Sequence, residues 1–344
     1  MLIIYIDLGR GWAPITQMAN LAAELFEADL QVVSYSRPSA AKHLSAMLMR
    51  RDRDASEECL VIAPSATFLP APLLIEGWRK RFRTICGWAI DSFWEDRIPR
   101  FLRRSNLYDH FFVTTHQDVG MWSSRVNAPV QTLPWGSDVL RLGGDESDRP
   151  WDLLRVGRQP ADWDDDGPSE LDASSEKLTF HGRPAFIDNA IEGQKMLMSL
   201  YRQSKYLLAF SNTFNPTSYT HPTREYLTAR WVDALACGAV VAGIPPREPG
   251  EAELLWDGAL LDLGTTKRRA GLSIIAEAVR AWTPSQAKRN HLQALKRLDW
   301  RLRFQKIAAV MHISPPALGR EITKLESRIA LIESQRPSDK SLRA

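Results

Sequence analysis

The 344-residue sequence lacks any apolar run long enough to cross a membrane, and it contains only three cysteines. A spanning helix needs about 20 consecutive apolar residues, whereas Asp7 ends the N-terminal apolar run after six residues, too early for a secretory signal. The cysteines lie far apart, without disulfide or metal-ligand spacing. We therefore expect a reduced, cytoplasmic chain whose membrane contact, if any, is peripheral.

The sequence also has little excess charge of either sign. Forty-four Lys and Arg against 41 Asp and Glu leave a formal charge of +3, which argues against a dedicated nucleic-acid coat protein. With 44% hydrophobic and 25% charged residues, the composition is that of an ordinary globular protein. Its outlier is 12 tryptophans, which predict either aromatic-lined clefts or a well-filled core.

Short apolar runs alternate with amphipathic stretches, a rhythm typical of parallel sheets with crossover helices. The predicted strands of the first half are 2–7, 30–35, 59–63, 84–90 and 110–114, with helices at 15–27 and 73–83. Those of the second half are 153–156, 178–181, 206–210, 239–242 and 260–263, with helices at 189–203, 224–236 and 272–282. A Gly-, Asp- and Pro-rich linker at 130–150 separates two doubly wound α/β domains, which bind ligands between the carboxyl ends of their sheets.

The most informative segment is HPTREYLTARWVDALACGAVVAG, residues 221–243. Pro222 predicts a helix start and Gly238 its end. Glu225 then lies in the first turn and Asp233 two turns later, within about 80° on one face. Free backbone N–H groups of the first turn favour an anion such as a diphosphate. An amphipathic surface helix with a salt-bridged face is the simpler alternative.

The acidic pair of Glu225 and Asp233, followed by A-L-A-C-G-A, resembles that of the group 1 (family 4-like) glycosyltransferases of GT-B fold. Arg230, three residues before the second acid, is more similar to the spore-maturation-type branch. The resemblance implies two Rossmann-like domains facing a cleft. It also implies that Glu225 contacts the donor sugar hydroxyls and Asp233 the nucleotide ribose, although Asp is one methylene shorter than the usual Glu.

Further segments agree in order with this resemblance. LPWGSD, residues 133–138, resembles the interdomain linker, and DWRLRF from Asp299 resembles the closing helix. LLRVGR ends at Arg158, which the resemblance assigns to the donor diphosphate. The usual lysine after this arginine is replaced by an acidic stretch, PADWDDDGPSELDASS, which we expect to be a solvated loop. The candidates to compensate for the missing lysine are Arg183, Arg224 and Arg230.

The resemblance implies an acceptor-side domain at 1–140, a donor domain at 141–298, and closing helices with a C-terminal extension at 299–344. Asp91 follows a predicted strand where related families carry a His or Asp touching the reacting sugar, although a helix N-cap would use Asp equally well. The other acceptor-side candidates are Gly9, Arg10, Gly11, Trp12 and His116. Trp88 and Trp94, which flank Asp91, and Trp12 are candidates for stacking on a sugar.

The implied activity is a hexosyltransferase-type transfer from a nucleoside-diphosphate sugar, such as a UDP-sugar, to an acceptor hydroxyl. The acceptor is a saccharide, a lipid-linked sugar or another small molecule. Because the sequence has no metal-ligand cluster, arginines and helix N-termini must stabilise the leaving group. We expect no metal and no cofactor, and the resemblance implies retention of the anomeric configuration. A GT-B nucleotide-sugar epimerase, which needs similar acids and a His, remains an alternative.

The tail from Ser314 spaces its apolar residues as a heptad seam. The seam consists of Leu318, Ile322, Leu325, Ile329 and Ile332. It predicts a final helix packed on the first domain or on the mate of a homodimer. As an alternative, residues 306–329 resemble the helix-turn-helix of LysR-type regulators, with Arg320 and Lys324 on the recognition helix. That resemblance implies DNA binding or a nucleic-acid-directed glycosyltransferase.

Overall fold

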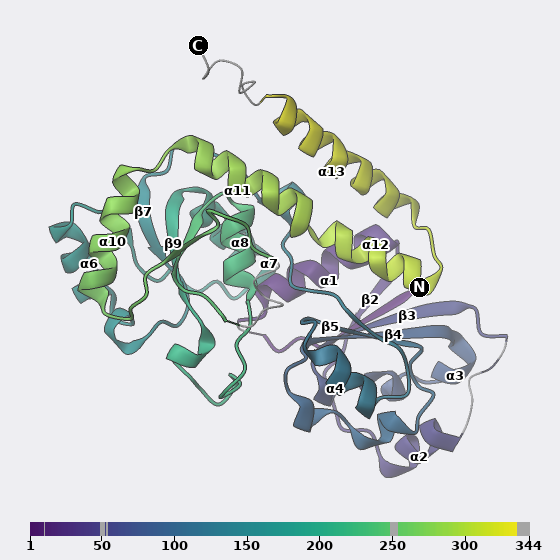
Figure 1. Ribbon diagram of the computed structural model, residues 1–344. Helices are drawn as coiled ribbons and strands as arrows, with labels where there is room; N and C mark the ends of the chain where they lie inside the picture. The colour runs from purple at the N-terminus through teal and green to yellow at the C-terminus, as the bar shows by residue number, and fades with distance from the viewer. Residues whose placement is uncertain (10, 49–51, 53, 248–253, 336–344) are drawn as a thin grey trace.

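The computed structural model describes residues 1–9, 11–48, 52, 54–247 and 254–335. Figure 1 shows two α/β bodies side by side, bridged by C-terminal helices. The first sheet is parallel, with strand order β2-β1-β3-β4-β5-β6. Its strands are β1 (Leu2–Tyr5), β2 (Asp29–Val32), β3 (Glu57–Ser65), β4 (Phe82–Asp91), β5 (His110–Val113) and β6 (Val130–Thr132).

The second sheet is also parallel, with strand order β11-β10-β9-β7-β8. Its strands are β7 (Trp151–Arg155), β8 (Phe180–His181), β9 (Ser204–Phe210), β10 (Val240–Ile244) and β11 (Leu260–Asp262). The predicted α/β class with two doubly wound sheets is confirmed. It is the arrangement that the resemblance to GT-B enzymes implied.

Helices cover both faces of each sheet. In the first half they are α1 (Ala13–Phe26), α2 (Ala40–Leu48), α3 (Trp78–Arg81), α4 (Asp118–Arg125) and α5 (Val139–Leu142). In the second half they are α6 (Asp166–Ser175), α7 (Ala190–Arg202), α8 (Ala229–Ala236), α10 (Arg268–Arg280), α11 (Pro284–Arg297), α12 (Trp300–Met311) and α13 (Pro316–Ser334). No helix in the described ranges is long and apolar enough to span a bilayer.

Three local predictions are wrong. The helix expected at 73–83 is reduced to the single turn α3, because Gly77 takes a left-handed φ of 66° and the chain enters β4 at Phe82. Strand β6 lies in the segment expected to be a linker, and its three residues are too few to show an alternating pattern. Most of the acidic stretch expected to be a loop forms α6, which Asp165 caps by accepting a hydrogen bond from the Gly167 amide.

The chain crosses between the two bodies twice, and the two crossings are hydrogen-bonded to each other. The Ser137 amide donates to the Leu298 carbonyl at 2.9 Å, and the Trp300 amide donates to the Ser137 carbonyl at 3.0 Å. Gly136 is required here, since a Cβ would lie 2.5 Å from the Leu298 carbonyl oxygen. After the second crossing, α12 packs into the first-domain core, where Trp300 meets Trp88 edge to face with ring centroids 5.7 Å apart.

Helix α13 lies across both bodies (Figure 1). Leu318 is buried in the core of the first domain, whereas Leu325 and Ile332 are buried in that of the second. The predicted packing on the first domain is therefore confirmed, and contact with the second domain is added. The apolar seam that the sequence suggested for a homodimer therefore packs on the two domains of the same chain.

Candidate active site

Each sheet has a switch point, where successive crossovers run in opposite directions and the loops at the carboxyl ends diverge. In the first sheet it lies between β1 and β3, and in the second between β7 and β9. Open parallel sheets bind ligands at such points. The loop after β1 contains Gly9 and Gly11, the loop after β7 contains Arg158, and the segment after β9 leads to Glu225.

The Glu225 carboxylate is held by three donors at the carboxyl edge of the second sheet. Ser211 Oγ donates to Oε1 at 2.7 Å, Thr213 Oγ1 donates to Oε1 at 2.9 Å, and the Arg247 amide donates to Oε2 at 2.8 Å. Burial by itself would raise the pKa of Glu225, but these hydrogen bonds outweigh it, so that the pKa is lowered. Glu225 is therefore a fixed, ionised carboxylate at neutral pH.

Glu225 does not lie in a helix, contrary to the sequence-based prediction. Helix α8 begins only at Ala229, and its N-cap Thr228 is extended. Residues 221–227 form neither a helix nor a strand: Leu227 is buried in the second core, and Tyr226 stacks on Phe93 of the first domain, with ring centroids 4.1 Å apart. Glu225 and Asp233 thus do not share one helix face.

Two arginines meet at the end of β7. Arg158 donates to Thr217 Oγ1 at 2.8 Å and to the Tyr219 hydroxyl at 2.6 Å. Arg230, in the first turn of α8, donates to the Arg158 carbonyl at 2.8 Å. Burial lowers the pKa of Arg230, and the charge of Arg158 lowers it further. In the described part of the chain neither guanidinium pairs with a carboxylate, so two positive charges lie together uncompensated.

The other predicted arginines are already paired. Arg183 forms an ion pair with Asp164 at 3.0 Å, and Arg224 reaches the first domain to pair with the buried Asp118 at 3.0 Å. Asp164 also pairs with the fully buried Arg155 at 2.5 Å. The acidic stretch is therefore a charge partner for arginines rather than a solvated loop. Of the three candidates, only Arg230 retains an uncompensated charge.

Asp233 is buried, with 3% of its surface exposed. Its Oδ1 accepts from Ser137 Oγ at 2.6 Å, and its Oδ2 accepts from Gln194 Nε2 at 2.9 Å. Burial raises the pKa of Asp233 to about 6, against the lowering effect of these two hydrogen bonds. Asp233 thus ties α8 to the interdomain crossing and to α7, while its contact with a ribose stays a prediction.

Asp91 ends β4 and faces the same region from the first domain. Burial raises the pKa of Asp91 to about 7, opposed by the charge of Arg97. No other residue in the described ranges forms a hydrogen bond with its carboxylate. Tyr226 connects the two sides: burial raises its pKa, the Asp91 carboxylate raises it further, and Arg158 and Arg230 oppose this effect. Asp91, Arg158 and Arg230 therefore all lie within electrostatic reach of one side chain.

The predicted acceptor-side turn has the expected backbone conformation. Gly9 and Gly11 have left-handed φ values of 73° and 87°, and the Gly9 amide donates to Asp7 Oδ1 at 2.8 Å. Trp12 follows as the N-cap residue of α1. Arg10 lies outside the described residues. Its role on the acceptor side stays a prediction.

The remaining first-domain candidates differ in exposure. His116 is exposed after β5. Trp88 is fully buried in the core, so its predicted stacking on a sugar is wrong. Trp94 is partly buried, with the Arg97 guanidinium 3.5 Å from its ring centroid and the His221 ring at 5.1 Å. In the described ranges no three His, Cys, Asp or Glu side chains are placed to hold a metal ion.

No family model and no curated protein matches the sequence. Among similar solved structures are pneumococcal O-GlcNAc transferase GtfA in complex with UDP and GlcNAc (14% identity, TM-score 0.45) and TarM (9% identity, TM-score 0.47). These matches cover 75% and 78% of this chain, which spans 57% of the length of each of those proteins. S. aureus MnaA with UDP is 12% identical over 98% of this chain and 99% of its own, with a TM-score of 0.41.

Sequence reasoning missed the side chains that hold the site together. Ser211 and Thr213 fix Glu225, Gln194 fixes Asp233, and Tyr226 joins the two domains. Only Tyr226 had a sequence signal, an aromatic residue directly after the first acid. The others are ordinary polar residues whose importance depends on distant partners.

Proposed function

We propose that this chain transfers a sugar from a nucleoside-diphosphate sugar to an acceptor hydroxyl. The observation that carries the proposal is the ionised Glu225 at the same sheet edge as two uncompensated guanidinium groups, Arg158 and Arg230. A carboxylate binds sugar hydroxyls, and adjacent arginines bind a diphosphate. The resemblance to group 1 glycosyltransferases gives Glu225 the donor sugar and, through the LLRVGR segment, gives Arg158 the diphosphate, with Arg230 as the candidate that compensates for the missing lysine.

In this proposal the arginines neutralise the charge that develops on the departing diphosphate. Such preorganised donors are worth about 2.7–4 kcal/mol each in transition-state stabilisation. Because these cations are side chains, transfer proceeds without a metal and without a cofactor. Glu225 orients the donor sugar, and Asp91 accepts a hydrogen bond from a hydroxyl at the reacting face. Retention of configuration then follows from front-face attack assisted by the leaving phosphate.

The test is Glu225→Ala, assayed for sugar release and transfer with a panel of nucleotide sugars. We expect transfer to be abolished while the melting temperature stays within a few degrees of the wild type, because Glu225 is a partly exposed loop residue. Glu170→Ala, which removes an exposed glutamate from α6, is the matched control. Full activity of the Glu225 variant would overturn the assignment.

Ligand binding gives a second readout of the same site. A nucleoside diphosphate at about 100 times its dissociation constant stabilises by roughly 2.7 kcal/mol, and Arg158→Ala should remove that stabilisation. Absence of a thermal shift with every nucleotide tested would contradict the proposal.

A product formed from donor alone would indicate an epimerase instead. Salt-sensitive DNA binding that Arg320→Glu abolishes would support the helix-turn-helix alternative.

A further inference from the structure

The first domain has an unusual surface on the side turned away from the second domain, around α2 (Figure 1). Two leucines one helical turn apart, Leu44 and Leu48, have 52% and 73% of their surface exposed. Positions i and i+4 lie on one side of a helix, so the two leucines project together. Ala46, on the opposite side, is buried and anchors α2 to the domain.

Two neighbouring segments flank α2 and bring positive charge to this surface. Arg79 of α3 donates a hydrogen bond to Ser45 Oγ. His43 packs on Phe101, with ring centroids 4.7 Å apart, which fixes the turn Arg100–Arg103 against the helix. We define the α2 face as the two leucines together with six cations of α2, of α3 and of residues 100–104; Arg81 of α3, which pairs with Glu57, is not included. Its cations are Lys42, Arg79, Lys80, Arg100, Arg103 and Arg104.

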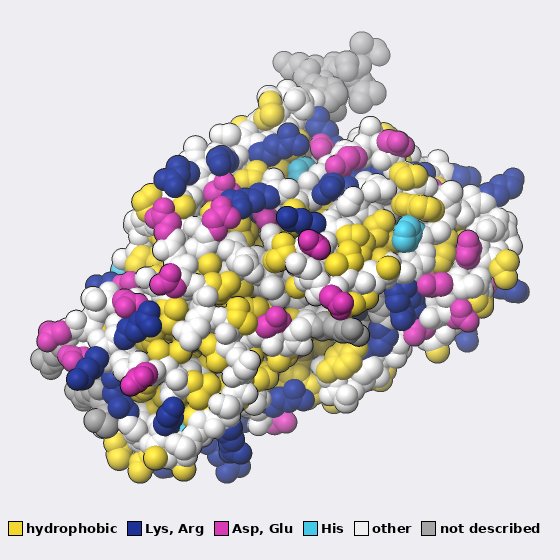
Figure 2. Space-filling view, turned by 180° about the vertical axis from the view of Figure 1, so that it is seen from behind, with side chains coloured by type: hydrophobic (Ala, Val, Ile, Leu, Met, Phe, Trp, Pro, Cys, Tyr) yellow, Lys and Arg dark blue, Asp and Glu magenta, His cyan; other side chains and the backbone are white. Residues whose placement is uncertain are grey.

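The cations of the α2 face are not neutralised by neighbouring acids. In the described ranges none of the six forms an ion pair, whereas the nearby Arg81 and Arg83 are neutralised by Glu57 and Glu58. The acids that remain on adjoining segments are Asp52, Asp54 and Glu76. The face therefore has an excess of positive charge, although the whole chain carries only +3. Figure 2 shows hydrophobic side chains with Lys and Arg side chains around them at the lower left, at the end of the first domain where the α2 face lies.

We propose that the α2 face docks on an anionic lipid surface. Each Lys or Arg near such a surface contributes about 1 kcal/mol of attraction, and exposed leucines on a short amphipathic helix gain by entering the acyl boundary. A nucleic acid would use the cations but has no place for the leucines. The cations together with the exposed leucines favour a lipid surface. This docking proposal does not depend on the proposed sugar transfer.

The test is co-sedimentation of the full chain with vesicles, without any nucleotide sugar. The vesicles contain phosphatidylcholine alone or with about one third phosphatidylglycerol, which supplies the anionic charge. We expect binding only to the anionic vesicles, weakening as salt rises from about 0.1 M to about 1 M. Arg100→Glu with Arg103→Glu should lower the partition coefficient by roughly thirtyfold or more, because at least two attractive cations are lost. Leu44→Ser with Leu48→Ser should lower it by about tenfold or more, because two apolar side chains no longer enter the acyl boundary.

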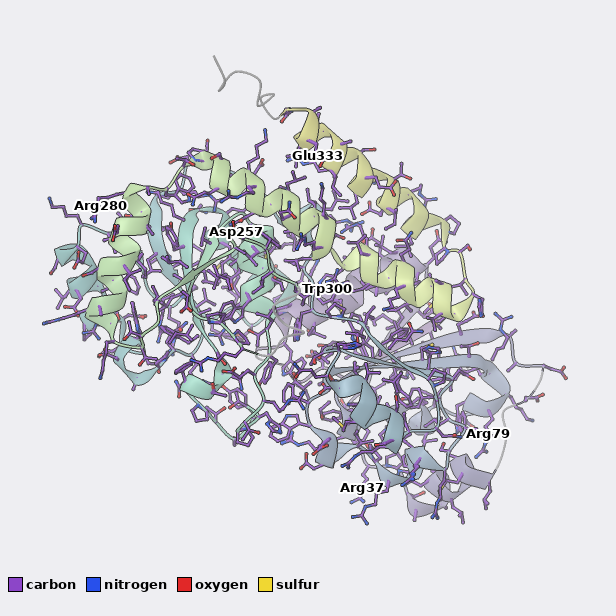
Figure 3. All side chains as sticks on the ribbon, in the orientation of Figure 1. Arg37, Arg79, Asp257, Arg280, Trp300 and Glu333 are labelled. Carbon is purple, nitrogen blue, oxygen red and sulfur yellow. The ribbon has the colours of Figure 1, made fainter. Side chains whose placement is uncertain are left out.

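Matched controls lie on the second domain, and Figure 3 shows Arg280 at the far end of the molecule from Arg79. Arg280→Glu with Arg289→Glu changes the net charge by the same amount as Arg100→Glu with Arg103→Glu, and Leu171→Ser removes an exposed leucine outside the α2 face. These variants should bind as the wild type does. Equal binding to neutral vesicles, no binding at low salt, or equal losses in the controls would overturn the proposal. Binding of duplex DNA that is equally strong for the wild type and for the Leu44→Ser, Leu48→Ser variant would also overturn it.

Discussion

Glu225 and Asp233 carry the same functional group, yet the protein shifts their pKa values in opposite directions. Glu225 is partly exposed and receives three hydrogen bonds, so its charged form is favoured. Asp233 is buried and receives two hydrogen bonds, whose lowering effect on the pKa is smaller than the raising effect of lost hydration. The first carboxylate is therefore ionised at neutral pH, as the proposed contact with a donor sugar requires. The second contributes to the stability of the protein in a pH-dependent way.

Asp233→Asn tests that pH dependence. The folded pKa of about 6 lies above the unfolded value of 3.8, so the stabilising contribution of the neutral acid is complete below pH 3.8 and is lost as the pH rises through 6. Asparagine does not titrate. Relative to the wild type, the variant should therefore gain about 2–3 kcal/mol of unfolding free energy between pH 4 and pH 7, measured by urea denaturation. A difference between the variant and the wild type that stays constant over this pH range would contradict this account.

At the scale of elements, α13 is attached to the domain crossings by charge as well as by its leucines. Arg301, fully buried at the start of α12, pairs with Asp138 at 2.9 Å, Asp299 at 3.0 Å and Glu321 of α13 at 2.7 Å. Burial would raise the pKa of Glu321, but hydrogen bonds from Lys324 and Arg301 lower it to about 2. The linker, the closing helix and the last helix therefore share one buried cation.

Glu321→Gln removes one of the three charges around Arg301. Leaving a buried charge partly uncompensated costs up to about 3–5 kcal/mol, and because two carboxylates remain we expect a loss of about 2 kcal/mol in urea denaturation. Glu326→Gln, which neutralises an exposed glutamate on the same helix, should change the unfolding free energy by less than about 0.5 kcal/mol. Equal effects of the two substitutions would show that the pairing adds no stability.

At the scale of the whole molecule, the two domains meet in direct side-chain contact at the candidate site. Phe93 and Tyr226 stack with an interplanar angle of 13°, and Arg224 pairs with Asp118 across the same boundary. Such contacts stabilise the arrangement described here relative to one in which the domains move apart. An aromatic pair contributes about 0.5–1.5 kcal/mol beyond its buried area.

Phe93→Ala should shift the equilibrium between the described arrangement and one with separated domains by about twofold to tenfold, which is the equivalent of losing the aromatic pair. We expect a larger radius of gyration in small-angle scattering and faster proteolysis of residues 212–228, with little change in circular dichroism. Phe101→Ala, which removes an aromatic contact within the first domain, should leave the scattering unchanged. Identical scattering of the Phe93 variant and the wild type would mean that the stack does not hold the domains together.

The sequence by itself determined the two parallel sheets, the glycine turn after β1 and the apolar seam of α13. These features depend on residues close together in the chain, and their periodicity is visible in any window of ten to twenty residues. Tertiary structure decided that Glu225 lies outside the helix, that Asp233 is buried and that, of the four arginines predicted at the donor site, Arg183 and Arg224 pair with carboxylates while Arg158 and Arg230 do not in the described residues. Those outcomes depend on partners far away in the chain, as with Ser137, which lies 96 positions before Asp233. Local patterns carry no information about such contacts, because burial and charge pairing are set only when distant segments meet.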